Sequence, residues 1–325
     1  MDDASRTTRG GVGAAVIALG LIALALSAGW LSGAILDGHL PKCPTACASS
    51  AAADSTTTPA ADVLGTSSTP EATPTEPPDF PYVSARSIAV IDAGCGALMF
   101  GRNERLHLPP ASLTKLMTAA VALDRAKPNT MITSDVDGAK LNDETGSTVM
   151  GLRPGMELSL LDLLYGLLLP SGNDAAIAIA EGVGGSEEKF VELMNEKVES
   201  LGLEDTRFTN PHGLTEDGLY SSAYDMAILA RYVMQNETLR KIVTSISWQP
   251  RWDGPPVWNG NEFLTKYEGA DGVKIGYTEE AQQTIVASAT RGGRRIIASL
   301  MRSQDRYTDS ERVLDWAFSK PSACP

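Results

Sequence analysis

The chain has 325 residues, 43% of them apolar and 21% charged, which is the balance of a globular protein with a sizeable buried core. The formal net charge of −13 excludes nucleic acid as an expected partner, because phosphate binding needs clustered Lys and Arg. The four cysteines have no histidine partner at zinc-ligand spacing, so we expect neither a metal site nor a cofactor.

The first predicted element is a single membrane-spanning helix at residues 12–36. This run carries no charge and is longer than the about 20 residues with which a helix crosses a bilayer. Arg6 and Arg9 precede it, so the positive-inside rule places residues 1–11 in the cytoplasm and the rest of the chain outside. A cleaved signal peptide is the alternative, because Ala23-Leu24-Ala25 has cleavage-site spacing; the apolar run continues well past it, which favours an uncleaved anchor.

Residues 37–81 are dominated by Thr, Ser, Ala and Pro and contain few large apolar side chains that a core would bury. Such a composition is typical of a disordered linker. We therefore expect a flexible tether that joins the membrane segment to a folded domain at residues 82–325.

The pattern of the folded domain is mixed. Strand-like stretches at 83–92 and 97–100 flank Gly94-Cys95-Gly96, which predicts a hairpin. Apolar periodicity then predicts helices over 112–126, 160–168, 175–181, 187–201 and 223–234. Strands follow at 273–276, 284–289 and 295–301, and a closing helix at 310–318. Strands at both ends with helices between them indicate an α+β domain whose termini share one sheet.

This arrangement also predicts a disulfide. Cys95 lies in the first hairpin and Cys324 just past the last helix, so both are expected at the same sheet. An extracytoplasmic domain permits disulfides, and we predict a Cys95–Cys324 bridge. Cys43 and Cys47 lie close to the membrane segment and are free to pair with each other.

The first candidate catalytic pair is Ser112 and Lys115, at the start of an apolar helix. Spacing of i to i+3 puts the hydroxyl and the amine on one helical face, and a helix N-terminus favours developing negative charge. A lysine with a lowered pKa can then serve as a base. Ser112 alone is equally well explained as a helix N-cap. Ser186 and Lys189 repeat the spacing in an acidic stretch, which we interpret as surface.

Two further motifs follow in order. Ser171-Gly172-Asn173 comes after the apolar run LLYGLLLP, and Lys274-Ile275-Gly276 lies in the strand-like GVKIGYT. Alone, the first is typical of a capping turn and the second of a surface lysine on a strand.

Together, the three elements resemble the S-x-x-K, S-x-N and K-T-G motifs of penicillin-binding proteins and serine β-lactamases. The surrounding LPPASLTKLMTA, LLLPSGNDAA, TNPHGL and YSSAYDMAILARY are similar to low-molecular-mass D-alanyl-D-alanine carboxypeptidases, the S11 serine peptidases. The resemblance runs from about residue 86 to residue 318. It implies a β-lactamase/transpeptidase-like domain with an antiparallel sheet flanked by helices, and an enzyme of the bacterial cell membrane that acts outside the cytoplasm.

The resemblance also implies roles for these residues. Ser112 would attack the bond between the two terminal D-alanines of a peptidoglycan pentapeptide, and Lys115 would take its proton. Ser171 and Lys274 would pass that proton to the leaving D-alanine, and Asn173 would hold Lys115 and the substrate amide. β-Lactam antibiotics are the implied covalent inhibitors.

Further substrate contacts are implied in the same way. The backbone N–H groups of Ser112 and Tyr277 would form the oxyanion hole. Gly276 and Thr278 would line the substrate site, and Arg306 would attract the terminal carboxylate.

Histidine is not expected to take part. His212 lies in the turn Asn210-Pro211-His212-Gly213-Leu214, which is structural in the family, and His39 and His107 belong to no motif. A lysine base leaves no task for a Ser-His-Asp triad.

The sequence departs from the family at two positions. Ile275 stands where the family has the Thr or Ser that binds the substrate carboxylate, and Gln282 stands where it usually has glycine. An alkyl group cannot donate a hydrogen bond, so the carboxylate contact would be weakened.

Three functions therefore stay open at this point. The first is a working D-Ala-D-Ala carboxypeptidase; the alternative is a catalytically weakened protein that binds peptidoglycan or β-lactams in the same cleft. The third is a β-lactamase, which the SGN form of the second motif and the lack of an E-x-x-L-N stretch disfavour.

Overall fold

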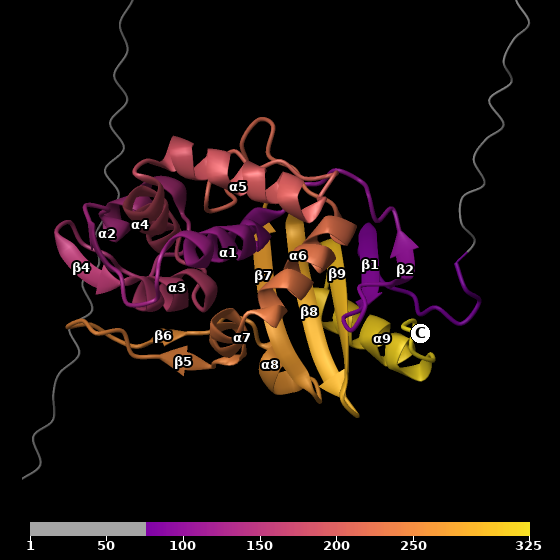
Figure 1. Cartoon of the computed structure of the whole chain (residues 1–325). Coiled ribbons are helices and arrows are strands. Elements are labelled where there is room, and N and C mark those ends of the chain that lie inside the picture. Colours follow the sequence, from indigo (N-terminus) through magenta and orange to yellow (C-terminus); the bar gives the residue numbers. More distant parts are fainter. Residues whose placement is uncertain (1–75) are drawn as a thin grey trace, which may run out of the picture. The chain divides into compact units, whose positions relative to one another are not determined.

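The computed structural model describes residues 76–325, which are built around a five-stranded antiparallel sheet (Figure 1). The strand order is β2-β1-β9-β8-β7, formed by β1 (Ser87–Asp92), β2 (Leu98–Arg102), β7 (Ala270–Thr278), β8 (Gln282–Arg291) and β9 (Arg294–Ser303). Strands from both ends of the described chain thus share one sheet, as predicted. The predicted segment 12–36 and the pair Cys43 and Cys47 lie outside the described residues.

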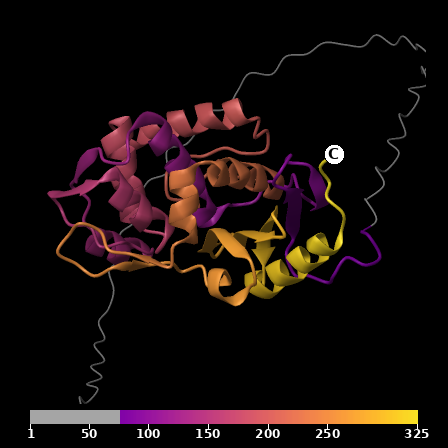
Figure 2. The same ribbon diagram turned by 60° about the horizontal axis from the view of Figure 1, so that its bottom comes forward.

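Each face of the sheet is covered by its own apolar core. In β1 every residue is buried; Ile88 and Val90 point into one core and Ala89 and Ile91 into the other. The first core packs against α9 (Arg306–Ser319), which runs along one face of the sheet (Figure 2). The second packs against a layer of helices on the opposite face. Successive β1 side chains therefore point alternately into the two cores, and β1 is buried on both of its faces.

The helical layer contains the helices that the apolar periodicity predicts. It contains α1 (Lys115–Arg125), α3 (Leu160–Leu168), α4 (Asn173–Gly184), α5 (Glu187–Leu201) and α6 (Ala223–Gln235). Most of α3 is buried, which explains its uniformly apolar sequence LLDLLYGLL. Side chains of Ser159, Ser186 and Ser222 accept hydrogen bonds from N–H groups in the first turns of α3, α5 and α6.

Several short elements were not predicted. They are β3 (Met131–Ser134), α2 (Gly138–Thr145), β4 (Met156–Ser159), α7 (Glu237–Thr244), β5 (Ser247–Trp248), β6 (Val257–Trp258) and α8 (Phe263–Lys266). None is longer than 8 residues, so few turns or alternations are available to establish a period.

Several predicted boundaries need correction; the strand predicted from residue 83, for example, begins at Ser87. The helix predicted from residue 112 begins as a 3-10 turn, η1 (Ala111–Thr114), and becomes α-helical only at Lys115. The last helix begins at Arg306 rather than residue 310, because Asp305 caps it. The linker predicted to end at residue 81 ends earlier: Phe80 stacks on Phe100 with ring centroids 3.7 Å apart. No helix within residues 76–325 combines the length and apolarity needed to cross a bilayer.

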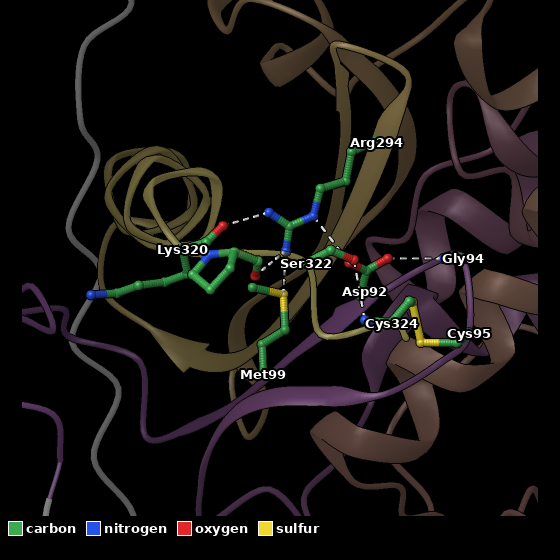
Figure 3. A network of polar contacts seen from close by, with 9 residues as sticks. Asp92, Gly94, Cys95, Met99, Arg294, Lys320, Ser322 and Cys324 are labelled. Carbon is green, nitrogen blue, oxygen red and sulfur yellow. Dashed lines mark hydrogen bonds and ion pairs between the residues drawn. A yellow bond between two sulfur atoms is a disulfide. The ribbon is translucent and has the colours of Figure 1, made fainter.

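The predicted Cys95–Cys324 disulfide is present, with Cα atoms 5.7 Å apart, and it ties the C-terminal tail to the β1–β2 hairpin. Beside it the Asp92 carboxylate accepts hydrogen bonds from Gly94 N (3.1 Å), Arg294 Nε (3.0 Å) and Ser322 Oγ (3.0 Å) (Figure 3). We call Asp92, Gly94, Arg294 and Ser322 the tail network.

Candidate active site

A cleft of about 590 Å³ opens at the β7 edge of the sheet, between β7 and the helical layer. All but one of the predicted catalytic and substrate residues line it: Ser112, Ser171, Asn173, Lys274, Ile275, Gly276, Tyr277, Thr278 and Arg306. The exception is Lys115, which is fully buried beneath Ser112. The structure therefore brings the three sequence motifs together in one place.

Ser112 lies in η1, where both the residue before it and a turn packed against that residue have a left-handed backbone conformation. Ala111 before it has a φ of 51°, in the left-handed region that non-glycine residues rarely adopt. Gly213 lies so close that a Cβ there would stand 2.0 Å from Ala111 O. Glycine at position 213 thus allows the His212–Leu214 turn to press against η1 and to support the nucleophile from below.

Lys115 is oriented by three hydrogen-bond partners. Its Nζ lies 3.0 Å from Ser112 Oγ, 2.6 Å from Asn173 Oδ1 and 2.7 Å from His212 O. A neutral amine has two N–H bonds and one lone pair. Since the two carbonyl oxygens can only accept, they take both N–H bonds, and the lone pair is directed at the Ser112 hydroxyl.

The electrostatics favour this neutral form. Burial lowers the pKa of Lys115 well below its usual value, and the positive charge of Lys274 lowers it further, whereas the Asp174 carboxylate opposes the shift. Lys115 has no salt bridge to any residue of the described part of the chain. The site therefore holds an amine poised as a general base next to a nucleophilic hydroxyl.

His212 contributes its backbone rather than its ring. Burial lowers the pKa of its imidazole to about 3, and Lys115 adds to the effect, so the ring is neutral at physiological pH. Nδ1 accepts a hydrogen bond from Leu214 N at 3.2 Å. The contact of His212 O with Lys115 was not predicted, because a carbonyl group carries no sequence signal.

The second motif forms the turn before α4. Ser171 has a φ of 69°, and its Oγ is buried without a hydrogen-bond partner among residues 76–325. Asn173 begins α4, with its amide oxygen on Lys115. This places an unpaired hydroxyl in the cleft close to the chemistry.

Sequence reasoning also missed Asp174. Its buried carboxylate accepts hydrogen bonds from Met150 N (2.8 Å), Gly151 N (2.8 Å) and Leu152 N (2.9 Å). These bonds fasten the 150–152 segment to the start of α4 and thereby brace Asn173. Only the neighbouring S-G-N motif pointed to this region.

Lys274 lies in β7 and is buried, with its Nζ 3.1 Å from Ile275 O. Burial lowers its pKa to about 7, and the nearby charge of Arg306 acts in the same direction. It is therefore not the surface charge that a strand lysine usually is, and it can exchange a proton near neutral pH.

The glycine of the third motif permits close approach to the nucleophile. A Cβ at Gly276 would stand 2.9 Å from Ser112 N and 2.6 Å from Thr284 Oγ1. The backbone of β7 thus runs directly beside the N–H of Ser112, where an oxyanion hole needs two backbone donors.

Ile275 and Thr278 differ in what they offer. Ile275 is half-buried in the cleft wall and has no donor. Thr278 Oγ1 accepts from Ala281 N at 3.1 Å and lies 3.1 Å from Thr215 Oγ1, whose own proton goes to Glu280 Oε2 at 2.9 Å. The Thr278 hydroxyl is therefore already engaged, as an acceptor from Ala281 N and in contact with Thr215 Oγ1.

Gln282, the other departure, has a φ of 55°. This left-handed conformation favours glycine, the residue that the resemblance led us to expect there. Within residues 76–325 no cluster of three or more His, Cys, Asp or Glu side chains has the arrangement of a metal site.

Comparison with known proteins places these features in context. A family model described as D-alanyl-D-alanine carboxypeptidase, peptidase S11, matches residues 71–305. D-alanyl-D-alanine carboxypeptidase DacF of Bacillus subtilis is 38% identical over 248 residues, which cover 74% of this chain and 64% of that protein. This chain thus spans less than two thirds of the length of that relative.

Solved structures agree on the fold. The D-alanyl-D-alanine carboxypeptidase of Mycobacterium tuberculosis H37Rv is similar with a TM-score of 0.71 and 32% identity, covering 78% of this chain and 98% of that one. The Streptomyces K15 DD-transpeptidase is similar with a TM-score of 0.70 and 28% identity, covering 74% and 99%.

Proposed function

Since this chain belongs to the peptidase S11 family of D-alanyl-D-alanine carboxypeptidases, we propose that it removes the terminal D-alanine from peptidoglycan stem peptides. The observation that carries the proposal is the buried Lys115 amine, held by Asn173 and His212 with its lone pair on Ser112. β-Lactam antibiotics, which acylate such a serine, are the proposed covalent inhibitors.

In the first step Ser112 Oγ attacks the carbonyl carbon between the two D-alanines. Lys115 accepts the hydroxyl proton as the new C–O bond forms, and the negative charge moves to the carbonyl oxygen. Backbone N–H groups of Ser112 and Tyr277 stabilise that oxygen, and each such donor contributes about 2.7–4 kcal/mol in comparable enzymes.

In the second step the C–N bond breaks and the leaving amine needs a proton. The unpaired Ser171 hydroxyl and Lys274, with its pKa of about 7, supply a route from Lys115 to that nitrogen. D-alanine departs and leaves an ester on Ser112. Water then attacks the ester, with Lys115 again as base, and releases the shortened peptide and the free serine.

The test combines two measurements on the full chain: D-alanine release from a pentapeptide and labelling by a fluorescent penicillin. We expect both for the wild type and neither for Ser112→Ala. Ser186→Ala is the matched control, because Ser186 has the same spacing to a lysine but caps α5 at the surface. Labelling of Ser112→Ala would contradict the mechanism.

The same pair of measurements separates the other functions. Labelling without D-alanine release would identify a catalytically weakened binding protein. Ile275 is the reason to test for this outcome, because it cannot donate a hydrogen bond to the substrate carboxylate. Rapid loss of label with breakdown of the antibiotic would identify a β-lactamase.

We further propose that residues 12–36 anchor the protein in the bacterial cell membrane and that the catalytic domain lies outside the cytoplasm. The support is the uncharged run, the arginines before it and the Cys95–Cys324 disulfide, which suits an oxidising compartment. The full chain should be found in the membrane fraction, and protease added to intact cells should digest the domain; protection of the domain would contradict this topology.

A further inference from the structure

Arg306 has only one terminal nitrogen left for a ligand. It is the first residue of α9 and lines the cleft. Nη1 donates to Gly276 O at 2.8 Å and to Thr284 O at 3.3 Å, and Nε donates to Gln283 Oε1 at 3.2 Å. Nη2 has no hydrogen-bond partner among residues 76–325. The guanidinium is thus held on one edge, with one donor nitrogen free.

Gln283 provides the acceptor that turns the guanidinium. It lies in β8 opposite Tyr277 of β7, and its Oε1 accepts from both Arg306 N (3.1 Å) and Arg306 Nε (3.2 Å). Its Nε2 donates to Gln304 O at 3.0 Å. Both ends of the carboxamide are therefore occupied, which fixes its orientation.

The bond to Arg306 N has a structural value of its own. The first N–H groups of a helix have no intrahelical acceptor, and Gln283 satisfies one of them at the start of α9. The second bond, to Nε, ties the partly buried guanidinium to the same carboxamide and so fixes the direction of its free edge.

In this chain Arg306 has to supply more of the carboxylate contact than it would beside a Thr or Ser at position 275. Ile275 has no hydroxyl, and the hydroxyl of Thr278 is engaged with Thr215. The strength of a bond to a carboxylate depends on direction, and a freely rotating arginine would lose side-chain entropy on binding. A residue that orders Arg306 beforehand removes that cost.

We propose that Gln283 is a positioning residue, which holds Arg306 so that Nη2 faces the terminal carboxylate of the substrate. This inference rests on the proposed function of the cleft. A neutral acceptor suits the task, since a carboxylate at this position would pair with the guanidinium and compete with the substrate anion.

The test compares three variants with the wild type. Gln283→Met removes the acceptor at similar volume. Gln283→Glu keeps an acceptor for both Arg306 donors, adds a competing charge and loses the donor to Gln304 O. Gln304→Met is the matched control, because its side chain is exposed and its backbone acceptor is retained. Each variant is assayed for KM and kcat of D-alanine release, and its thermal unfolding is measured.

We expect KM to rise about tenfold in Gln283→Met and in Gln283→Glu with kcat within about twofold, and no change in Gln304→Met. Adding Ile275→Thr to Gln283→Met should recover part of the KM, because it restores a second donor. A purely structural cap would behave differently: Gln283→Glu would restore the wild-type KM, and this result would overturn the proposal.

A second readout does not depend on peptide hydrolysis. Acylation rates are compared for a penicillin and its methyl ester, which lacks the anionic carboxylate. We expect the carboxylate preference of the wild type to shrink about tenfold in Gln283→Met, because only the acid uses the ordered arginine. An unchanged ratio overturns the positioning role. If the wild type is acylated but releases no D-alanine, only the proposed hydrolysis is overturned. The ratio of the two acylation rates then still decides the role of Gln283.

Discussion

The cleft lies at the β7 edge of the sheet and the tail network at the ends of β1 and β9, and the two bury charged groups in opposite ways. In the cleft, Lys115 and Lys274 are buried amines without a carboxylate partner in the described part of the chain, and burial lowers the pKa of both. In the tail network, burial raises the pKa of Asp92, but hydrogen bonds from Gly94, Arg294 and Ser322 outweigh it and leave the pKa below its usual value.

This difference separates chemistry from stability. The tail network favours the charged form of its carboxylate, so it stabilises the fold wherever that group is ionised. The cleft disfavours the charged form of its amines, so it gives up stability in return for a base that is neutral at working pH. The same physical variable, burial of charge, serves two purposes because one site supplies partners and the other withholds them.

The largest effect should come from removing the base. Lys115→Met fills similar space without a basic nitrogen, so acylation by penicillin should slow by about 10²–10⁴-fold. The time course of fluorescent labelling measures it. Lys189→Met is the control, since Lys189 has the same spacing from a serine but is exposed. A rate within tenfold of the wild type would mean that another group takes the proton.

The next effect concerns the paired charge. Asp92→Asn should destabilise the fold by about 3 kcal/mol at pH 7, because it leaves the Arg294 guanidinium without its anion. The folded pKa of Asp92 is lowered, so its stabilisation is present above the unfolded pKa of about 3.9 and is lost as pH falls through the folded pKa.

Urea unfolding at pH 7 and near pH 3 measures this dependence. The difference between wild type and variant should shrink at the lower pH. Asp143→Asn, at an exposed position, is the control and should change neither value. A difference that grows as pH falls would contradict the assignment of the charged form.

Removal of the unpaired charge should have the opposite sign. Lys274→Met should abolish D-alanine release and yet stabilise the fold by about 2 kcal/mol at pH 6, because the protonated amine is buried. Above the folded pKa of about 7 the native lysine is neutral, while the unfolded chain keeps its proton up to about pH 10.4. Wild-type stability therefore rises through this window, and the gain from the substitution disappears.

Thermal or urea unfolding at pH 6 and pH 9.5 distinguishes these cases. The exposed Lys241→Met is the control and should show no such pH dependence. A variant less stable than the wild type at pH 6 would show that Lys274 is stabilised by a partner, and the comparison between the two regions would fail.

The smallest expected effect comes from a substitution in the cleft wall. Ile275→Thr adds a donor beside Arg306, so kcat/KM for peptides ending in D-Ala-D-Ala should rise about tenfold. Acylation by penicillins should rise in parallel, because they carry a comparable carboxylate. An unchanged rate would indicate that the wall at Ile275 does not contact the carboxylate and would favour the binding-protein alternative.

Much of this could be predicted from the sequence, because local periodicity carries it. The one-turn spacing of Ser112 and Lys115 places both on one face of a helical segment, and apolar repeats located α3 and α5 at their observed bounds. Strand patterns at both chain ends implied one sheet, and from that followed the Cys95–Cys324 bridge. Each of these features depends either on residues that are close in sequence or on the pairing of strands from the two ends of the domain.

Only the tertiary structure decided which groups surround those residues. His212 O reaches Lys115 from 97 positions away, and Gln283 Oε1 reaches Arg306 across 23. Neither contact has a sequence signal, because a carbonyl group is present at every residue and a glutamine is common on strands. Burial, which lowers the pKa of both cleft lysines, is likewise a property of the packed layers and not of the motif. Sequence thus determined the reactive groups, and packing determined their protonation and direction, since both depend on neighbours that only the folded chain brings together.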